Sequence, residues 1–304
     1  MPRALTEEDK LIAISALMSL VFAVGGITIG WWLKSSIIVF DGIYSLISLG
    51  LSLLSLIAGR YVRLRDDAKF PFGKSIIQPI TLVFKYLTIF LLCTLSIIDG
   101  IQTLLAGGRE LNYLSALIYS GVVTLLCLGA YRFLVVRTKP EHSELLVAEH
   151  REWLLDTGLS LMLTVGFALA LLLAWFGFRD MALYIDPIML IIAATYFLRI
   201  PVTGLLSSGR EVVGLKVADE LEDEIRSYVD DIVRARGFRS HFLRIQKVGT
   251  TVYLEVDFVV RDPGSALTIA EQDRIRAELF AKIRHHPYRW WYTVSFTADE
   301  KWAR

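Results

Sequence analysis

Residues 11–33 read LIAISALMSLVFAVGGITIGWWL and contain no charged side chain. A helix needs about 20 consecutive apolar residues to cross the hydrocarbon core of a bilayer, so this run predicts a membrane-spanning helix. The preceding residues, MPRALTEEDK, are polar and acidic, and no small-residue cleavage site follows a short apolar core. We therefore expect a retained span rather than a removable signal peptide.

The same pattern continues to about residue 206, because charged residues are sparse up to that point and dense from 209 onward. We predict an α-helical membrane protein with six transmembrane helices, residues 1–210, followed by a small cytoplasmic α+β domain, residues 211–304. The six apolar spans run approximately over 11–33, 36–62, 76–105, 113–136, 149–176 and 181–206.

Composition excludes several classes of protein. An apolar share of 54% is too high for a disordered chain, and a net charge of +1 is too small for a bulk nucleic-acid binder. The two cysteines, Cys93 and Cys127, both lie in apolar runs, so neither a disulfide framework nor a cysteine zinc motif can be built. The sequence contains no Gly-rich phosphate loop and no nucleophile elbow, and we expect no enzyme activity and no bound cofactor.

The orientation of the spans in the membrane follows from the basic residues near the connectors, because Lys and Arg are enriched on the cytoplasmic side. The second and fourth connectors, with their helix ends, hold Arg60, Arg63, Arg65, Lys69, Lys74, Arg132, Arg137 and Lys139. The first, third and fifth connectors hold only Lys34, Arg109 and Arg179. We therefore expect the second and fourth connectors, and with them both termini, in the cytoplasm.

The charged tail has the periodicities of a ferredoxin-like αββαβ domain. The expected elements are a helix over 218–236, strands over 242–248 and 250–258, a turn over 262–265, a helix from Thr268 and a strand over 291–296. Apolar residues at spacings of three and four mark the helices, and alternation marks the strands. This order fits a sheet covered on one face by two helices.

Ionisable residues inside a membrane span are costly, so each is a candidate functional residue. In the second span, Asp41 is followed one and two helical turns later by serines. In the fifth span, Glu149, Glu152 and Asp156 are three and four apart, which places their carboxylates on one helical face. Oxygen ligands from two helices suit a divalent cation such as Mg²⁺, Mn²⁺ or Fe²⁺.

Other placements of these side chains stay open. Glu149 and Glu152 can lie in the headgroup zone, and Asp41 can lie at the outer interface. Asp156 is roughly 10 Å further along the helix than Glu149, which makes a surface position hard to explain. Lys85 in the third span either snorkels inward or pairs with the carboxylates and takes the place of the cation.

Residues 34–45, KSSIIVFDGIYS, resemble the second-helix signature of the cation diffusion facilitators, or cation efflux proteins, with Asp41 at the family's first metal-binding Asp. Residues 70–74, FPFGK, resemble the loop between helices two and three. Residues 148–157, AEHREWLLDT, resemble the fifth-helix motif, in which a His or Asp precedes an Asp by four. Asp186-Pro187 and the αββαβ tail also fit, so the resemblance covers almost the whole chain.

The departures from the family pattern bear on the substrate. Ser45 stands where the family usually has Asp or Asn, and Glu152 takes the place of the fifth-helix His or Asp. The loop His is replaced by Lys74, and the acidic residue after it by Gln78. Loss of His argues against strict zinc selectivity, and the carboxylate-rich pair of helices resembles what the family uses for manganese or iron.

The tail also departs from zinc-binding relatives. Its second helix has Glu271-Gln272 where a His is expected, and His241, His285 and His286 show no convincing ligand set in the sequence. We interpret His285-His286 as a helix-end feature, and we expect a tail that senses no zinc, so that residues 212–304 fold and pair without metal.

The resemblance implies a secondary active transporter that exports a divalent cation, such as Mn²⁺, Fe²⁺ or Zn²⁺, from the cytoplasm against protons. The implied metal ligands are Asp41, Ser45, Glu152 and Asp156. Spans one, two, four and five would move against the other two, and a homodimer would form through the tail, with Trp290-Trp291 as a possible contact. The expected location is the bacterial inner membrane, in contact with lipid. The alternative is a degenerate, non-transporting member that acts as a scaffold or partner subunit.

Overall fold

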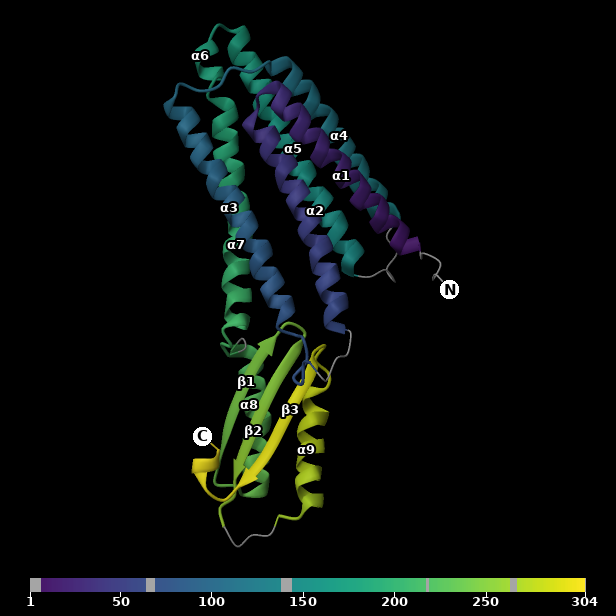
Figure 1. Cartoon of the computed structure of the whole chain (residues 1–304), viewed down its shortest axis with the longest axis vertical. Helices are drawn as coiled ribbons and strands as arrows, with labels where there is room; N and C mark the ends of the chain where they lie inside the picture. The colour runs from purple at the N-terminus through teal and green to yellow at the C-terminus, as the bar shows by residue number, and fades with distance from the viewer. Residues whose placement is uncertain (1–6, 64–68, 138–143, 217–218, 263–266, 304) are drawn as a thin grey trace. The chain divides into compact units, whose positions relative to one another are not determined.

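The computed structural model describes residues 7–63, 69–137, 144–216, 219–262 and 267–303, and Figure 1 labels their helices and strands. Arg65, Lys139 and residues 263–265 of the predicted turn lie outside the described residues. The side chains of Arg63 and Glu149 are not described either.

The apolar spans are long helices. They are α1 (Glu7–Leu33), α2 (Ser36–Arg63), α3 (Ile77–Leu105), α4 (Tyr113–Arg137), α5 (Glu144–Trp175) and α7 (Ile185–Val212). Among the described residues, six helical segments are long and apolar enough to cross a membrane, so the six predicted spans are confirmed.

The last span differs in detail from its prediction. A separate four-residue helix, α6 (Arg179–Ala182), precedes α7, which has Pro187 in its first turn. Proline is tolerated there because its missing N–H would have no partner within the helix. The helix also continues beyond residue 206, since hydropathy falls before the helical backbone ends.

The structure comprises two compact units. One is Met1–Leu54 with Lys85–Val202, and the other is Ser55–Phe84 with Thr203–Arg304. The boundary between residues 210 and 211, which we drew from charge density, stays a prediction.

In the first unit, α1 and α2 cross with their backbones in contact at Gly26 and Gly42. A Cβ atom added to Gly42 would lie 2.6 Å from the amide nitrogen of Ile27 and 2.9 Å from the carbonyl oxygen of Ala23. Only glycine allows this approach, and Gly42 directly follows Asp41 in the sequence. The crossing therefore fixes the part of α2 that carries the first predicted ligand.

Helix α5 is bonded to α1 through a buried tryptophan. The indole Nε1 of Trp153 donates a 2.8 Å hydrogen bond to Ser15 Oγ, and Trp153 is 2% exposed. Helices α4 and α5 pack against each other, and both contact α1. Large buried side chains of the core include Phe40, Leu163, Phe167, Leu190 and Phe197.

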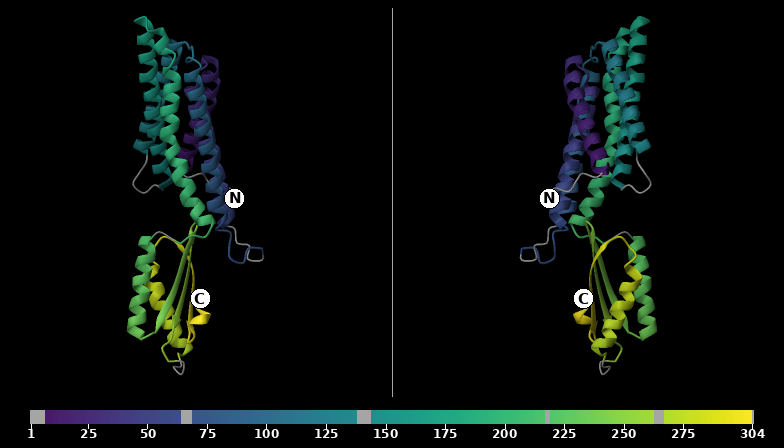
Figure 2. Two further views of the ribbon diagram at one scale, coloured as in Figure 1. Left: turned by 90° about the vertical axis from the view of Figure 1, so that its left-hand side faces the viewer. Right: turned by 90° about the vertical axis from the view of Figure 1, so that its right-hand side faces the viewer.

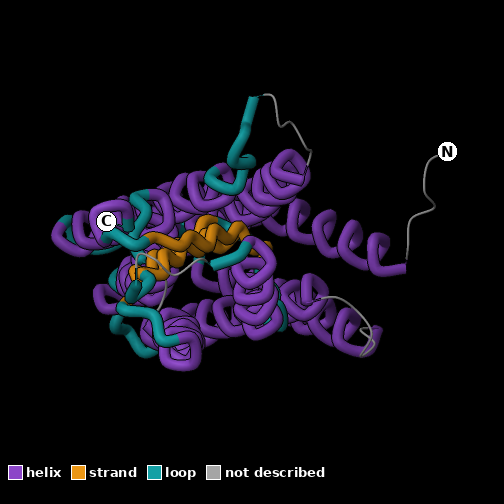
Figure 3. Tube along the Cα trace, turned by 90° about the horizontal axis from the view of Figure 1, so that it is seen from below, coloured by secondary structure: helices purple, strands orange, loops and turns teal. Residues whose placement is uncertain are grey.

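The second unit contains a three-stranded sheet in the order β1-β2-β3. The elements are α8 (Asp219–Arg236), β1 (Ser240–Val248), β2 (Thr251–Val259), α9 (Ile269–Ile283) and β3 (Arg289–Thr297), with a 3₁₀ turn at Glu300–Trp302. The pair β1/β2 is antiparallel and β2/β3 is parallel. Figure 3 shows the strands as one layer. The predicted αββαβ order is confirmed.

Helices α8 and α9 cover the same face of the sheet (Figure 2). Alternate residues of β2, among them Val252, Leu254 and Phe258, face these helices and are at most 2% exposed. Glycine at 237 adopts φ +67° just after α8, as expected for a helix C-terminus. Thr268 and Glu271 form a capping box at the start of α9.

The β1–β2 turn, Gly249-Thr250, is bonded to helix ends within the same unit. The amide of Gly249 donates to Glu211 Oε2 at 2.8 Å, and the amide of Thr250 donates to Gln78 Oε1 at 3.1 Å. Glu211 belongs to the last turn of α7 and Gln78 to the first turn of α3. Both amides of the turn are therefore satisfied by side chains distant in the sequence.

Candidate functional site

A small polar cavity lies between α1, α2 and α5. Its volume is about 40 Å³, and a cavity needs roughly 10–15 Å³ to hold one water, so the space suits an ion or a few waters. The lining residues are Ala16, Ser19, Tyr44, Ser45, Ser48, Leu49, Ser52, Glu152 and Asp156. Three of the four predicted metal ligands, Ser45, Glu152 and Asp156, are thus brought together.

Three of the hydroxyl groups come from one face of α2. Ser45, Ser48 and Ser52 follow one another at spacings of three and four, which aligns them along the helix. Ser48 Oγ donates a 2.8 Å hydrogen bond to Glu152 Oε1. This bond joins α2 directly to α5 at the cavity.

The two carboxylates come from α5. Glu152 and Asp156 are four residues apart, so they lie one above the other on the same face. Glu152 is exposed, whereas Asp156 is half-buried and lies one turn further into the apolar span. Asp156 is therefore the better shielded of the two acids.

Asp41 is not among the residues that line the cavity, although it lies one turn before Ser45 on α2. Asp41 and Glu152 both lie close enough to Asp156 for their charges to act on its carboxylate. Tyr44 lies within electrostatic range of all three acids. The structure therefore places Asp41 near the other three predicted ligands, one turn along α2 from the cavity.

The cavity contains only oxygen donors. Among the described residues, those that line it include no Lys, Arg, His or Cys. Lys85 of α3, the candidate internal cation, does not line the cavity. The side-chain amide oxygen of Gln78 instead accepts a hydrogen bond from the β1–β2 turn. Two carboxylates with several hydroxyls and no basic partner in the lining form an attractive environment for a hard cation.

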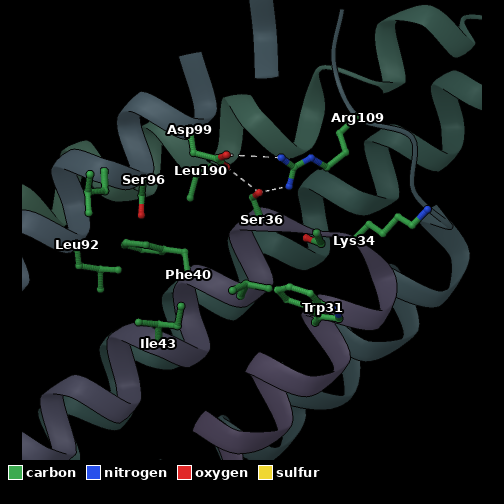
Figure 4. A pocket seen from close by; sticks show the side chains of 14 residues that line it. Trp31, Lys34, Ser36, Phe40, Ile43, Leu92, Ser96, Asp99, Arg109 and Leu190 are labelled. Carbon is green, nitrogen blue, oxygen red and sulfur yellow. Dashed lines mark hydrogen bonds and ion pairs between the residues drawn. The ribbon is translucent and has the colours of Figure 1, made fainter. Parts of the chain in front are cut away.

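Two further intramembrane acids have structural partners instead. One of them, Asp99, borders a larger pocket of about 670 Å³ near the α1–α2 connection, drawn in Figure 4. There Asp99 accepts a 2.8 Å hydrogen bond from Ser36 Oγ and lies 3.7 Å from the guanidinium of Arg109. Asp186 accepts from Ser35 Oγ at 2.5 Å and from the amide of Ser36 at 3.1 Å, so it caps the start of α2.

In the tail, Glu271 also has a structural role. Its carboxylate accepts from the amide and the hydroxyl of Thr268, each at 2.9 Å, as part of the capping box of α9. Glu271, which stands where we expected a His in a zinc-binding tail, thus caps the start of a helix.

Ser19, Tyr44 and Ser52 line the cavity but were not predicted from the sequence. The run of small polar residues at positions 45, 48 and 52 of an apolar helix was a usable signal for Ser52. Ser19 belongs to another helix, α1, which crosses α2 closely at Gly26 and Gly42.

The family model described as the cation efflux transmembrane domain matches residues 12–212. This segment includes α2 and α5, and with them all of the predicted metal ligands. Comparison with curated proteins gave no match.

Proposed function

Because this chain belongs to the cation efflux family, whose members are transporters and not enzymes, we propose that its carboxylate cavity binds the transported divalent cation. The chain is an integral multi-pass membrane protein that acts in metal cation efflux. The observation that carries the proposal is the convergence of Ser45, Glu152 and Asp156 on one small cavity.

The donor set supports Mn²⁺ and Fe²⁺ ahead of Zn²⁺ as substrates. Carboxylate and hydroxyl oxygens favour harder cations, whereas imidazole and thiolate ligands, which favour zinc, are not among the lining residues. Asp41 completes the site when the ion draws α2 and α5 together. Two carboxylates would neutralise the charge of the ion, and Asp41 would add a third.

Exchange for protons follows from the same side chains. A carboxylate that has taken up a proton loses most of its attraction for a cation, so proton and metal compete for Glu152 and Asp156. Protons entering from outside would release the metal, and metal entering from the cytoplasm would displace the protons. An ion gradient would thus supply the energy.

Topology and assembly are part of the proposal. The basic residues near the second and fourth connectors support cytoplasmic termini, and α1, α2, α4 and α5 would move against α3 and α7. The open face of the sheet supports pairing of two tails. Trp291 on that face is 42% exposed, whereas Trp290, also considered as a contact, packs against the tail core.

A transport screen of the purified protein in proteoliposomes tests the proposal. Uptake of Mg²⁺, Mn²⁺, Fe²⁺, Co²⁺, Ni²⁺, Zn²⁺ and Cd²⁺ would be followed together with a pH-sensitive dye inside the vesicles. We expect Mn²⁺ or Fe²⁺ uptake with a matching proton movement. A wild type that moves no ion, while Lys85→Ala gains metal binding, would instead favour the non-transporting alternative.

A further inference from the structure

A second cluster of metal-ligating side chains lies in the tail, where the end of α9 meets α8. His286 Nε2 is 3.3 Å from Glu224 Oε2, and His285 Nε2 is 3.6 Å from Glu224 Oε1. One ligand atom from each of the three residues lies within 4.8 Å of the other two. Such spacing needs only small side-chain adjustments for a single ion to contact all three atoms.

The turn that follows the C-terminal end of α9 positions both imidazoles. The helix ends at Ile283, and the amide of His286 donates to the carbonyl of that residue at 3.3 Å. The two rings lie 4.1 Å apart between centroids, so they present their Nε2 atoms to the same carboxylate. His286 is further held by Tyr288, whose ring stacks at 6.1 Å.

The carboxylate is positioned as well. Tyr228, one turn later on α8, donates a 2.8 Å hydrogen bond from its hydroxyl to Glu224 Oε1. Partners that orient a ligand from behind are typical of metal sites, because they reduce the reorganisation needed on binding.

One nitrogen of the cluster lacks a hydrogen-bond partner among the described residues when no ligand is bound. Nε2 of His286 is shielded from solvent and makes no hydrogen bond to any described residue, although Glu224 is near. A buried nitrogen without a hydrogen bond is costly, and it commonly indicates an absent ion or water. A metal bound through this nitrogen would remove the cost.

We propose that Glu224, His285 and His286 form a binding site for a borderline transition cation such as Zn²⁺, Co²⁺ or Ni²⁺. Two imidazole nitrogens and one carboxylate oxygen are a common ligand set for these ions, and a water completes a tetrahedral shell. The site is distinct from the capping position of Glu271. It also uses different chemistry from the all-oxygen cavity of the membrane helices.

The site joins parts of the tail that are distant in the sequence, because Glu224 precedes His285 by a helix and two strands. A bound ion would therefore cross-link α8 to the end of α9. For nitrogen-containing sites, affinity rises from Mn²⁺ through Co²⁺ and Ni²⁺, and Zn²⁺ also binds well above Mn²⁺. The tail site and the transport site would then take up different ions from a mixture.

Cobalt titration of the full-length protein in detergent tests the inference, with a purification tag that contains no histidine. We expect one Co²⁺ bound with the visible absorption of a tetrahedral site, and displacement by Zn²⁺ but not by Mn²⁺ or Mg²⁺. Glu224→Gln and His286→Gln should each weaken binding by about tenfold or more. The matched control, His241→Gln, removes a tail imidazole outside the cluster and should leave the affinity unchanged.

Two comparisons separate this inference from the proposed transport site. Asp156→Asn should keep the cobalt spectrum, and X-ray absorption of the zinc-loaded wild type should show two imidazole ligands. A wild type that binds neither Co²⁺ nor Zn²⁺ would overturn the inference. So would a cobalt signal that is lost in Asp156→Asn but kept in both cluster variants.

Discussion

Ser48 of α2 and Glu152 of α5 are joined by a 2.8 Å hydrogen bond at the rim of the polar cavity. They are separated by two whole helices in the sequence, and the bond is a direct polar contact between the two helices that carry the proposed ligands. A metal ion entering the cavity has to share the Glu152 carboxylate with this hydroxyl or replace it.

Ser48→Ala should weaken metal binding without abolishing transport. The substitution removes one oxygen donor and the contact that positions Glu152, but leaves both carboxylates. A hydrogen bond to a charged group contributes about 1.5–3 kcal/mol, so we expect the KM for the metal to rise about tenfold. Uptake kinetics in proteoliposomes measure this KM. An unchanged KM in Ser48→Ala, with Ser48→Thr as the conservative control, would show that the serine takes no part.

Asp156→Asn and Asp41→Asn should each abolish metal-coupled proton flux. Asparagine keeps the size of the side chain and removes the charge that attracts a divalent cation. Proton release recorded by an internal dye measures the flux, and size-exclusion chromatography checks the fold. Glu149→Gln is the control predicted to matter little. Undiminished flux in both Asn variants would place the transport site elsewhere.

Gly42→Ala should destabilise the membrane helices. The added methyl group would meet the backbone of α1 at 2.6 Å, and overpacking of this kind costs about 1–3 kcal/mol. We expect a lower Tm for the detergent-solubilised protein and reduced transport, because the crossing positions α2. Gly50→Ala, on the same helix with nothing within 4 Å of the new atom, is the matched control. Equal Tm values for the two variants would contradict the role given to the crossing.

Residues 212–304 expressed alone should fold without metal. The core between α8, α9 and the sheet is formed by apolar side chains of this segment, and its ordering needs no ion. Circular dichroism in the presence of a chelator should show a cooperative thermal transition. Zinc should then raise the Tm, because a ligand that binds only the folded state stabilises it. A fragment that stays unfolded until zinc is added would contradict this prediction.

The tail should lose stability as the pH falls below about 6.5, the ordinary pKa of histidine. Burial of its imidazole lowers the pKa of His241, Asp230 opposes the change, and Arg226 adds to it. The unfolded chain therefore takes up this proton at a higher pH than the folded chain. Stability is fully present above the unfolded pKa and declines until the folded pKa is reached. Denaturant unfolding of the tail fragment at several pH values measures the slope, which should be shallower in His241→Gln.

Much of the fold could be predicted because local signals agreed with it. Apolar runs located the spans, and apolar spacing predicted a helix from Thr268, which the structure shows as the N-cap of α9. The spacing of Glu152 and Asp156 likewise predicted a shared face. These features depend on helical or strand periodicity, which the sequence displays directly.

The remaining features depend on contacts between distant segments. No spacing rule joins Ser19 to Glu152, because their meeting depends on how closely α1 approaches α2 at a glycine. The pairing of Glu224 with His286 has the same origin, since it requires α8 and the end of α9 to share one end of the sheet. The two histidines do follow the end of a helix, as we predicted. The sequence did not indicate that Glu224 lies beside them.

The hydrogen bonds of the hairpin turn at Gly249-Thr250 restrict insertions at this point of the chain. Tips of hairpins usually accept insertions, because their backbone groups bond only to water. Here both amides bond to Glu211 and Gln78, and an added residue would displace at least one of them. Epitope tags or reporter domains inserted at this tip should therefore be poorly accommodated, and the turn should keep its two-residue length where other surface loops change.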